Sequence, residues 1–514
     1  MIWKVDIMRI NGKQLGLFLG PSLFLLLLLI PPLPYTDIVA SRIDLPFDKA
    51  PQYALGVLLW MAVWWISECV PLGLTGLIAP LMLSIAGILA WKSALMVFMH
   101  PIIWIFMAGF ILAKCFSKWG LDKRLALSLA SMYKGNNPML ATFFVACLPV
   151  FVLTTTGSIT ASTSIVYPLL LAYLKTLNLS EKSRYAEASM IALGQAATAG
   201  AMLLLISTPP NLVAKIVLES MGEQYSVNFF DWFIVGTPHA ILGLLISWLV
   251  TFYVVKPEMK TIEKLKERVE LEKKKLGSMS AGEKLTLVAF VMVLILWMIP
   301  GFLAIASSIR PELSSIYGYI KQALPEAAPV VILMIYVCLI KVKGEPILEW
   351  NELLRGIDWN VVFLFGGGIA LGSGLDKSGF SSWLVEIVTQ NVSFINDVWT
   401  LTLITSVIGF LITYPASNTA SAWIACPIAV TLARSAGINP IIPVIATALA
   451  CSISSALPST TPPMAIVYSS GYIRMWNMFK VGMISDTIRF IILIVLEPML
   501  ASMLCGMKGF PVYM

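Results

Sequence analysis

Four short polar segments interrupt the long apolar stretches of this 514-residue chain. Two are rich in serine and threonine, at residues 154–160 and 413–419, and two contain consecutive prolines, at residues 207–210 and 459–463. An irregular backbone at membrane depth is tolerated only where it is buried in protein or lines a wet cavity. Hydroxyl groups, and the amide of Asn418, can bind either a cation or an anion. The four segments therefore predict ion binding.

The proline pairs have a specific consequence for the helices that contain them. Proline lacks an N–H group and clashes with the preceding turn, so both helices should unwind locally. Unwinding frees backbone carbonyls for a cation, while the N-terminus of the following half-helix offers N–H groups and a partial positive charge to an anion. An isolated Ser/Thr patch is explained as well by close helix packing. Four interruptions in duplicate order favour a binding site.

The interruptions recur because the chain repeats itself. Residues Ser158-Ile-Thr160-Ala-Ser162 reappear 259 positions later as Ser417-Asn-Thr419-Ala-Ser421, and Thr208-Pro-Pro210 reappears 253 positions later as Thr461-Pro-Pro463. Further matches at the first spacing are Thr154 with Thr413, Pro168 with Pro427 and Gly109 with Gly368. If the first half crosses the membrane an odd number of times, such duplication gives the inverted repeat common among secondary transporters.

The composition excludes an ordinary soluble protein. Hydrophobic residues make up 58% of the chain, charged residues make up 12%, and the mean hydropathy is +0.85. Soluble domains carry roughly 25% charged residues. From the length of the apolar runs we expect an all-α polytopic membrane protein with about eleven transmembrane helices and two re-entrant hairpins.

Two halves and a charged loop organise the chain. The expected parts are a first half (1–255) with a hairpin at 139–174 and a broken helix at 186–219, a charged loop (256–284), and a second half (285–514) with a hairpin at 399–433 and a broken helix at 442–474. Basic residues near membrane segments mark the cytoplasmic side. The loop and the N-terminus, with Lys4, Arg9 and Lys13, should therefore face the cytoplasm, in a plasma-membrane protein. The net charge of +7 lies in such loops, so nucleic-acid binding is not expected.

Ionisable residues in or beside apolar runs have simple interpretations. His100 and His239 lie at ends of apolar runs, where interface or capping roles are expected. Lys114 and Lys215 should extend their ammonium groups to the membrane surface, and positive charge near a bound anion is the alternative role for Lys114. No Asp, Glu, His or Arg lies within the Ser/Thr tripeptides or the proline breaks, so neither a proton relay nor a catalytic acid–base pair is predicted there. A polytopic membrane enzyme is therefore poorly supported.

The motifs resemble those of the divalent anion/sodium symporters, a family that includes dicarboxylate, citrate and sulfate carriers. The resemblance runs from Trp64-Trp-Ile-Ser-Glu68-x-x-Pro71, through Phe365-Gly-Gly-Gly-Ile-Ala-Leu-Gly372, to Ser470-Gly-Tyr and Phe479. The family's marks are a Ser-Asn-Thr tripeptide at each hairpin tip and a Thr-Pro-Pro break in each following helix. The resemblance implies an elevator-type carrier, a homodimer in which a scaffold domain supports a mobile transport domain.

The same resemblance implies a set of binding residues. The second sodium site would use Thr413, the carbonyl of Ala416, Asn418 and the carbonyl of Thr460. The first sodium site would use Thr154, Ser158 and the carbonyl of Ser207. A small anionic substrate would be held by Ser158, Thr160, Ser417, Asn418, Thr419 and Thr461, with Thr208 and Pro462 of the proline motifs. Sodium is thus the implied coupling ion.

One position departs from the family pattern. Ile159 stands where the first tripeptide has asparagine, and its side chain can neither coordinate a cation nor donate to an anion. The first sodium site is therefore in doubt, unless Thr155, Thr156 or Ser162 compensates. A differently shaped anion, a reduced sodium stoichiometry and anion exchange without sodium all stay open. So do the functions of a sodium/proton antiporter and of an oxyanion efflux carrier. A second departure is Met464, which replaces the asparagine kept at Asn211.

Overall fold

The computed structural model of the protein describes residues 12–177, 179–180, 182–262, 265–391 and 397–513. Within these residues the regular structure is almost entirely helical, as predicted. The exception is a small antiparallel ribbon of β1 (Lys341–Val342) and β2 (Glu345–Pro346). Lys4 and Arg9, on which the predicted orientation of the N-terminus partly rests, lie outside the described residues.

Helices of the first half precede the charged loop. They are α1 (Gly12–Leu29), α2 (Thr36–Ala40), α3 (Ala50–Ser67), α4 (Leu72–Gly76), α5 (Ile78–Ile85), α6 (Trp91–Met96), α7 (Pro101–Trp119), α8 (Leu121–Ala130), α9 (Pro138–Thr142), the π-helical turn η2 (Phe143–Cys147), α10 (Leu148–Leu153), α11 (Ile159–Thr176), α12 (Arg184–Gly200), α13 (Pro209–Glu219) and α14 (Phe229–Val255). The short 3₁₀ turns are η1 (Val97–Met99), η3 (Thr154–Thr156) and η4 (Glu223–Tyr225).

The charged loop contains one helix of its own, α15 (Leu265–Lys275). The second half then consists of α16 (Ala281–Ile309), η5 (Pro311–Leu313), α17 (Ser314–Ala323), α18 (Ala328–Leu339), α19 (Trp350–Gly356), α20 (Trp359–Lys377), α21 (Phe380–Asn391), α22 (Val398–Ile412), α23 (Asn418–Ser435), α24 (Ile441–Cys451), α25 (Pro462–Tyr468) and α26 (Met475–Met507).

Six of the described helices are long and apolar enough to cross a membrane, and eight if each of two bent helix pairs counts as one span. The sequence predicts about eleven crossings, since each needs roughly 20 residues. Part of the difference arises in the hairpins and broken helices. Several of their arms, such as α22 with 15 residues and α24 with 11, are too short to qualify alone. The protein is thus a multi-pass membrane protein, and the count of eleven stays a prediction.

Each half contains one helical hairpin. Hairpin 1 comprises α9, η2, α10 and α11, and its turn, tip 1, is residues 154–158. Hairpin 2 comprises α22 and α23, and its turn, tip 2, is residues 413–417. Gly157 in tip 1 has φ +100°, a conformation that glycine adopts without steric cost. Both turns therefore lie where the sequence has its Ser/Thr-rich interruptions.

Each half also contains one broken helix. Break 1, residues 201–208, separates α12 from α13, and break 2, residues 452–461, separates α24 from α25. Each following helix has proline at its first positions, preceded by an extended threonine, Thr208 or Thr461. Proline suits the start of a helix because its missing N–H would have no helical partner there. The prolines thus start new helices after the unwound segments. α25 ends at Tyr468, before the predicted limit of 474.

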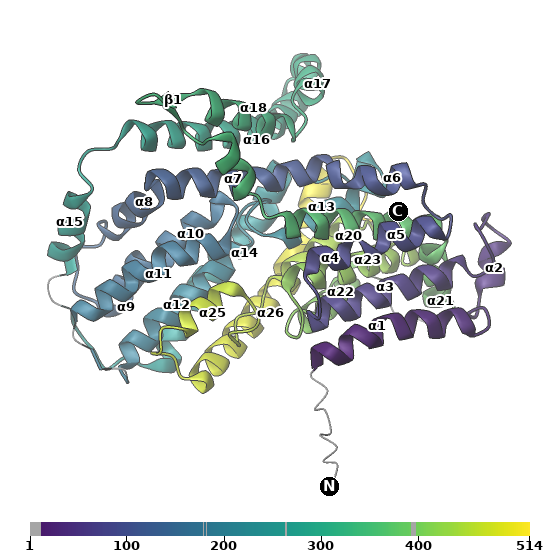
Figure 1. Ribbon diagram of the computed structural model, residues 1–514, viewed down its shortest axis with the longest axis horizontal. Helices are drawn as coiled ribbons and strands as arrows, with labels where there is room; N and C mark the ends of the chain where they lie inside the picture. Colours follow the sequence, from purple (N-terminus) through teal and green to yellow (C-terminus); the bar gives the residue numbers. More distant parts are fainter. Residues whose placement is uncertain (1–11, 178, 181, 263–264, 392–396, 514) are drawn as a thin grey trace, which may run out of the picture.

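The two halves are interleaved around these interruptions. α13 of the first half packs against α23 and α24 of the second, and α25 of the second half packs against α11 and α12 of the first. Figure 1 shows hairpin 1 and hairpin 2 on opposite sides of α26, which runs between them in yellow. α26 packs along α14 and also contacts α22 and α24. Each hairpin therefore packs against the broken helix of its own half and also against the second part of the broken helix of the other half.

Glycines set the closest approaches in this packing. A Cβ atom added to Gly109 of α7 would lie 3.0 Å from the Cα of Gly157 in tip 1, so the two backbones touch there. A Cβ atom at Gly367 would overlap the backbone of Gly76, and one at Gly368 would overlap the indole of Trp423 on hairpin 2. Gly366–Gly368 thus serves close helix packing.

Lys215 corrects one prediction about the ionisable residues. Its side chain is only 2% exposed and does not extend to the membrane surface. The ammonium group lies 2.6 Å from Glu219 and 2.8 Å from Glu326, and also donates to the carbonyl of Val227. A buried ammonium group is costly unless it is paired. The two carboxylates offset this cost for Lys215. The Lys215–Glu326 pair connects α13 to the segment before α18.

Candidate functional site

Tip 2 gathers several oxygen atoms. The hydroxyl of Thr413 lies 2.6 Å from the carbonyl oxygen of Cys451, at the end of α24, and 2.8 Å from the side-chain oxygen of Asn418. The hydroxyl of Ser454, in break 2, donates to the same Asn418 oxygen over 3.0 Å. Thr413 and Ser454 are fully buried, and Asn418 is partly exposed. Hydrogen bonds between these oxygen atoms therefore connect tip 2 to break 2 and to the end of α24.

Tip 1 repeats part of this arrangement. The hydroxyl of Thr154 lies 3.0 Å from the carbonyl of Gly200, at the end of α12, and 2.7 Å from the carbonyl of Phe151. Thr154 and Thr413 thus make equivalent contacts with the ends of their respective broken helices. Next to Ser158, however, Ile159 supplies no oxygen where Asn418 supplies one. Tip 1 therefore offers fewer side-chain ligands to a cation.

The residues that could compensate for Ile159 are used within the hairpin. Thr155 donates to the carbonyl of Val152 and Thr156 to that of Leu153. Ser162 donates to the carbonyl of Ser158. Each bond returns to the backbone three or four residues earlier, a common local pattern for Ser and Thr. In this structure none of the three hydroxyls replaces the missing amide.

The tripeptide serines begin the second arm of each hairpin. The Ser158 oxygen accepts a hydrogen bond from the N–H of Ala161, and the Ser417 oxygen accepts one from the N–H of Ala420. Each is thus the N-cap of a long helix, α11 or α23. A helix N-terminus carries unpaired N–H groups and a partial positive charge, which favour an anion. Both tips therefore present the same kind of anion-binding feature.

Exposure separates the predicted site residues into two layers. Thr154, Thr413, Ser207, Ala416 and Thr460 are buried, whereas the tripeptide residues of both tips are partly exposed and Pro462 is exposed. Thr208 and Thr461 are buried N-cap positions. The tripeptides are therefore more accessible than the threonines Thr154 and Thr413.

The breaks differ in how their polar groups are paired. Ser207 accepts a hydrogen bond from the N–H of Leu204, and the Asn211 amide donates to the carbonyls of Ala201 and Leu204 over 2.9 Å each. At the matching position, Met464 cannot donate, and its sulfur packs near Gly194. In break 1, the Asn211 amide therefore pairs with two backbone carbonyls of the unwound segment. In break 2, Thr460 donates to the carbonyl of Leu457, while the buried hydroxyl of Thr461 has no hydrogen-bond partner among the described residues.

Asp486 of α26 connects tip 2 to break 2. Its carboxylate accepts hydrogen bonds from the Tyr414 hydroxyl (2.9 Å), the Ser455 N–H (2.6 Å) and the Ser455 hydroxyl (2.7 Å). Arg489 lies 3.5 Å from the same carboxylate and also donates to Thr198 in α12. A carboxylate accepting several hydrogen bonds fixes the groups around it. Asp486 and Arg489 thus tie both broken helices to α26.

The sequence indicates the tips and breaks but not several of their partners. Neither Ser454 nor the carbonyls of Gly200 and Cys451 are predicted from it. Asp486 is missed as well, although an ionisable residue inside an apolar run is itself a signal of function. Among the predicted residues, the structure joins Thr413 directly to Asn418. The predicted use of the Ala416 and Thr460 carbonyls stays a prediction.

The oxygen atoms of tip 2 suit a sodium ion chemically. Hydroxyl, amide and carbonyl oxygens are the ligands that unwound helices offer to sodium in transporters. Thr413, Asn418, Ser454 and the carbonyl of Cys451 supply all three kinds, linked in a chain of hydrogen bonds from Cys451 through Thr413 and Asn418 to Ser454. Within the described residues there is no cluster of His, Cys, Asp or Glu that could hold a metal ion. These neutral oxygens are groups that could hold a monovalent cation.

Known proteins resemble this chain in sequence over both hairpins and both broken helices. The family described as "Sodium:sulfate symporter transmembrane region" matches residues 38–507. The sodium-dependent dicarboxylate transporter SdcS of Staphylococcus saprophyticus is 30% identical over 508 residues, which cover 96% of this chain and 92% of that protein. The SdcS protein of Staphylococcus aureus strain USA300 is 31% identical over 502 residues, covering 94% and 90%. The matched ranges include both hairpins and both broken helices.

Proposed function

Because the chain belongs to the sodium:sulfate symporter family, we propose that it is a sodium-coupled carrier of small di- or tricarboxylates or a related divalent anion. The resemblance drawn from the motifs is confirmed at the level of the family, so the protein is a transporter and not an enzyme. Its two relatives named above are sodium-dependent dicarboxylate transporters.

The proposed anion site lies between the two tips. It is formed by Ser158, Thr160, Ser417, Asn418, Thr419 and Thr461, with Thr208 and Pro462 beside them. Three features support it: the helix N-termini at Ser158 and Ser417, the partial exposure of both tripeptides, and the hydroxyl of Thr461, for which the described part of the chain supplies no hydrogen-bond partner. A divalent anion would thus meet N–H groups and hydroxyls instead of a fixed positive side chain.

The proposed second sodium site lies beneath tip 2. Thr413, Asn418 and the carbonyls of Ala416 and Thr460 are its ligands by resemblance, and the contacts of Ser454 support adding its hydroxyl. A bound sodium ion supplies positive charge beside the anion site, where hydroxyls and dipoles alone are weak partners for two negative charges. The proposed first site, with Thr154, Ser158 and Ser207, has fewer ligands because of Ile159. We therefore expect fewer coupled sodium ions than in a carrier with both asparagines.

One observation carries this proposal, the hydrogen-bonded cluster of Thr413, Asn418 and Ser454. The test is uptake of labelled succinate, malate, citrate and sulfate into proteoliposomes, with and without an inward sodium gradient. Asn418→Ala should abolish sodium-driven uptake. Ile159→Ala is the matched control, because it shortens the equivalent side chain of tip 1 without removing a ligand. No uptake of any of these anions, or unchanged uptake by Asn418→Ala, would overturn the proposal.

Ile159 favours a second candidate, anion exchange without sodium. A carrier that returns only when loaded needs no coupling ion, and tip 1 already lacks one cation ligand. Loading the vesicles with unlabelled anion separates the two modes. Exchange predicts that uptake depends on the internal anion and ignores sodium, whereas symport predicts the reverse.

The interleaved halves support an elevator mechanism as the means of transport. The moving domain would contain the two hairpins, the broken helices, α14 and α26, all of which pack together. The Lys215–Glu326 pair would lie where α13 of this domain meets a scaffold that includes α18. We further propose a homodimer in the plasma membrane, with the N-terminus in the cytoplasm. Cross-linking across the scaffold and protease accessibility of the loop at 256–284 test these two points.

A further inference from the structure

His239 and Glu497 form a buried polar pair that is not among the residues of the proposed anion site. His239 lies within α14 and Glu497 within α26. The Nε2 atom of His239 is 2.8 Å from one carboxylate oxygen of Glu497, and both side chains are at most 3% exposed. The other carboxylate oxygen of Glu497 is buried without a hydrogen-bond partner among the described residues. This placement also corrects the expectation that His239 has a capping or interface role.

Burial determines how many protons this pair carries. With no added proton, neutral histidine beside ionised Glu497 leaves one uncompensated charge in the protein interior, which is costly. With two added protons the pair carries one uncompensated positive charge. A single proton shared between Nε2 and the carboxylate gives either a neutral pair or an internal ion pair. The pair is therefore suited to hold one proton.

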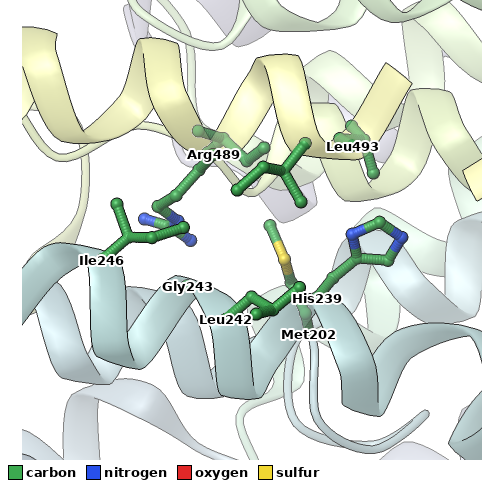
Figure 2. A pocket seen from close by; sticks show the side chains of 9 residues that line it. Met202, His239, Leu242, Gly243, Ile246, Arg489 and Leu493 are labelled. Carbon is green, nitrogen blue, oxygen red and sulfur yellow. The ribbon is translucent and has the colours of Figure 1, made fainter. Parts of the chain in front are cut away.

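A small cavity lies beside His239. It has a volume of about 10 Å³, about enough for one water molecule. Figure 2 shows His239 of α14 at one end and Arg489 reaching in from α26 at the other. The Nε atom of Arg489 is also buried without a hydrogen-bond partner among the described residues. A water molecule here would have polar partners on two helices and offers a first step for a proton.

Further titratable groups lie on the elements that pack against α14 and α26. On or directly after these two helices they are Asp231, Tyr253, Lys256, Lys480, Asp486, Arg489, Cys505 and Lys508. On the neighbouring elements they are Arg184, Tyr185 and Glu187 on α12, Glu283 and Lys284 on α16, Tyr414 after α22, Cys451 on α24 and Cys147 in η2. Arg489 pairs with Asp486, and Lys508 pairs with Asp231. The Asp486–Arg489 pair is neutral overall, so it does not supply the missing charge at Glu497.

The cavity also connects the pair to the helix breaks. Met202 of break 1 and Ile453 of break 2 both line it. In addition, α14 holds the backbone of break 1, because Trp232 donates to the carbonyl of Met202 and Thr237 donates to that of Leu203. The carbonyl of Gly200, two residues before Met202, accepts from Thr154 of tip 1. A change in the packing of α14 against α26 would therefore reach tip 1.

We propose that His239 and Glu497 form a proton-binding site whose loading and release accompany anion transport, an inference that rests on the proposed transport function. On loading, a proton from water adds to the pair and is held between Nε2 and the carboxylate. On release it returns to water on the other side of the membrane, with no electron transfer. The proton supplies positive charge in a carrier whose proposed first sodium site has fewer ligands because of Ile159. The anion and the proton move in the same direction.

The test measures proton movement directly. The full-length protein is reconstituted with a pH-sensitive dye inside the vesicles, and uptake of the transported anion is started at a pH at which that anion is fully ionised. Sodium is kept equal on both sides. Wild-type protein should acidify the interior during uptake. Glu497→Gln and His239→Gln should reduce this signal to that of protein-free vesicles. His100→Gln is the matched control, because it alters the only other histidine of the chain and should leave the signal unchanged.

Exchange of labelled anion at equal concentrations on both sides reports whether the variants are folded. We expect exchange to persist in Glu497→Gln and His239→Gln. Uptake by wild-type protein without acidification would overturn the proton site alone, as would acidification that persists in both variants. Loss of exchange in both variants would assign the pair to structure and also overturn it. No uptake by wild-type protein would overturn the transport function as well.

Discussion

The hydroxyl of Thr413 lies 2.8 Å from the side-chain oxygen of Asn418, five residues further along the chain. This contact crosses the turn of hairpin 2 and places two side-chain oxygens on the same side of it. The third oxygen comes from Ser454, in a different element, so the cluster exists only when hairpin 2 is seated on break 2. A cation that binds there therefore contacts the tip and the break together.

Ser454→Ala should weaken sodium dependence without stopping transport. The substitution removes one hydroxyl from Asn418 and leaves Thr413 in place, so the half-saturating sodium concentration should rise several-fold. A loss of about 1–2 kcal/mol of sodium binding corresponds to roughly 5–30-fold at room temperature. Sodium titration of anion uptake measures the change. Ser435→Ala, which removes a hydroxyl that donates to the carbonyl of Leu432 at the end of α23, is the control.

Ile159→Asn should increase the dependence of uptake on sodium. The new amide would stand at the position equivalent to Asn418, next to Ser158 and above Thr154, and would add the missing side-chain oxygen. Ile159→Leu keeps the apolar character and should leave the sodium response as it is. The measurement is the steepness of uptake against sodium concentration. An identical response for both variants would mean that this position does not set the coupling.

Lys215→Met should destabilise the protein strongly. The substitution leaves Glu219 and Glu326 close together without the ammonium group that compensates both. Removing one partner of a buried ion pair costs about 3–5 kcal/mol. Thermal unfolding in detergent measures the loss. Lys275→Met, which breaks a pair that is largely exposed, should change stability by only about 0–1 kcal/mol. Equal effects of the two substitutions would contradict the inferred burial of Lys215.

Tyr414→Phe should loosen tip 2 while leaving Asp486 its remaining partners. The hydroxyl of Tyr414 donates to Asp486 over 2.9 Å, and a hydrogen bond to a charged group contributes about 1.5–3 kcal/mol. We expect a lower unfolding temperature together with slower transport. Asp486→Asn should have the larger effect, because it also leaves Arg489 without its carboxylate. A Tyr414→Phe protein with wild-type transport and stability would show that this contact does not hold the tip.

The positions of the hairpins and breaks follow from the sequence for a clear physical reason. Polar residues and prolines are conspicuous in an apolar chain, and they mark the places where the backbone turns or unwinds. Such irregular backbone is tolerated at membrane depth only where it is buried in protein or lines a wet cavity. The duplication then marks the matching positions, such as Thr154 and Thr413. The family, the helical architecture and the multi-pass character are accordingly confirmed, whereas the ligand assignments stay predictions.

The partners of these positions could not be predicted, because they depend on packing. Every residue has a backbone carbonyl, so nothing in the sequence marks Gly200 and Cys451 as the acceptors for Thr154 and Thr413. The contact between Tyr414 and Asp486 joins residues 72 positions apart. The predictions for Lys215 and His239 are wrong for the same reason. Glu497, the partner of His239, and Glu326, one of the two carboxylate partners of Lys215, lie in the second half of the chain.

The two hairpins are seated in mechanically different ways. Gly157 rests on Gly109 with backbone against backbone, so neither residue places a side chain between tip 1 and α7 at this point. On the other side, the indole of Trp423 occupies the space that Gly368 leaves open, and close-packed interiors do not deform continuously. The ring must leave this hollow before hairpin 2 can shift along α20. Hairpin 1 therefore meets α7 through a backbone contact at this point, whereas hairpin 2 meets α20 through an inserted aromatic ring.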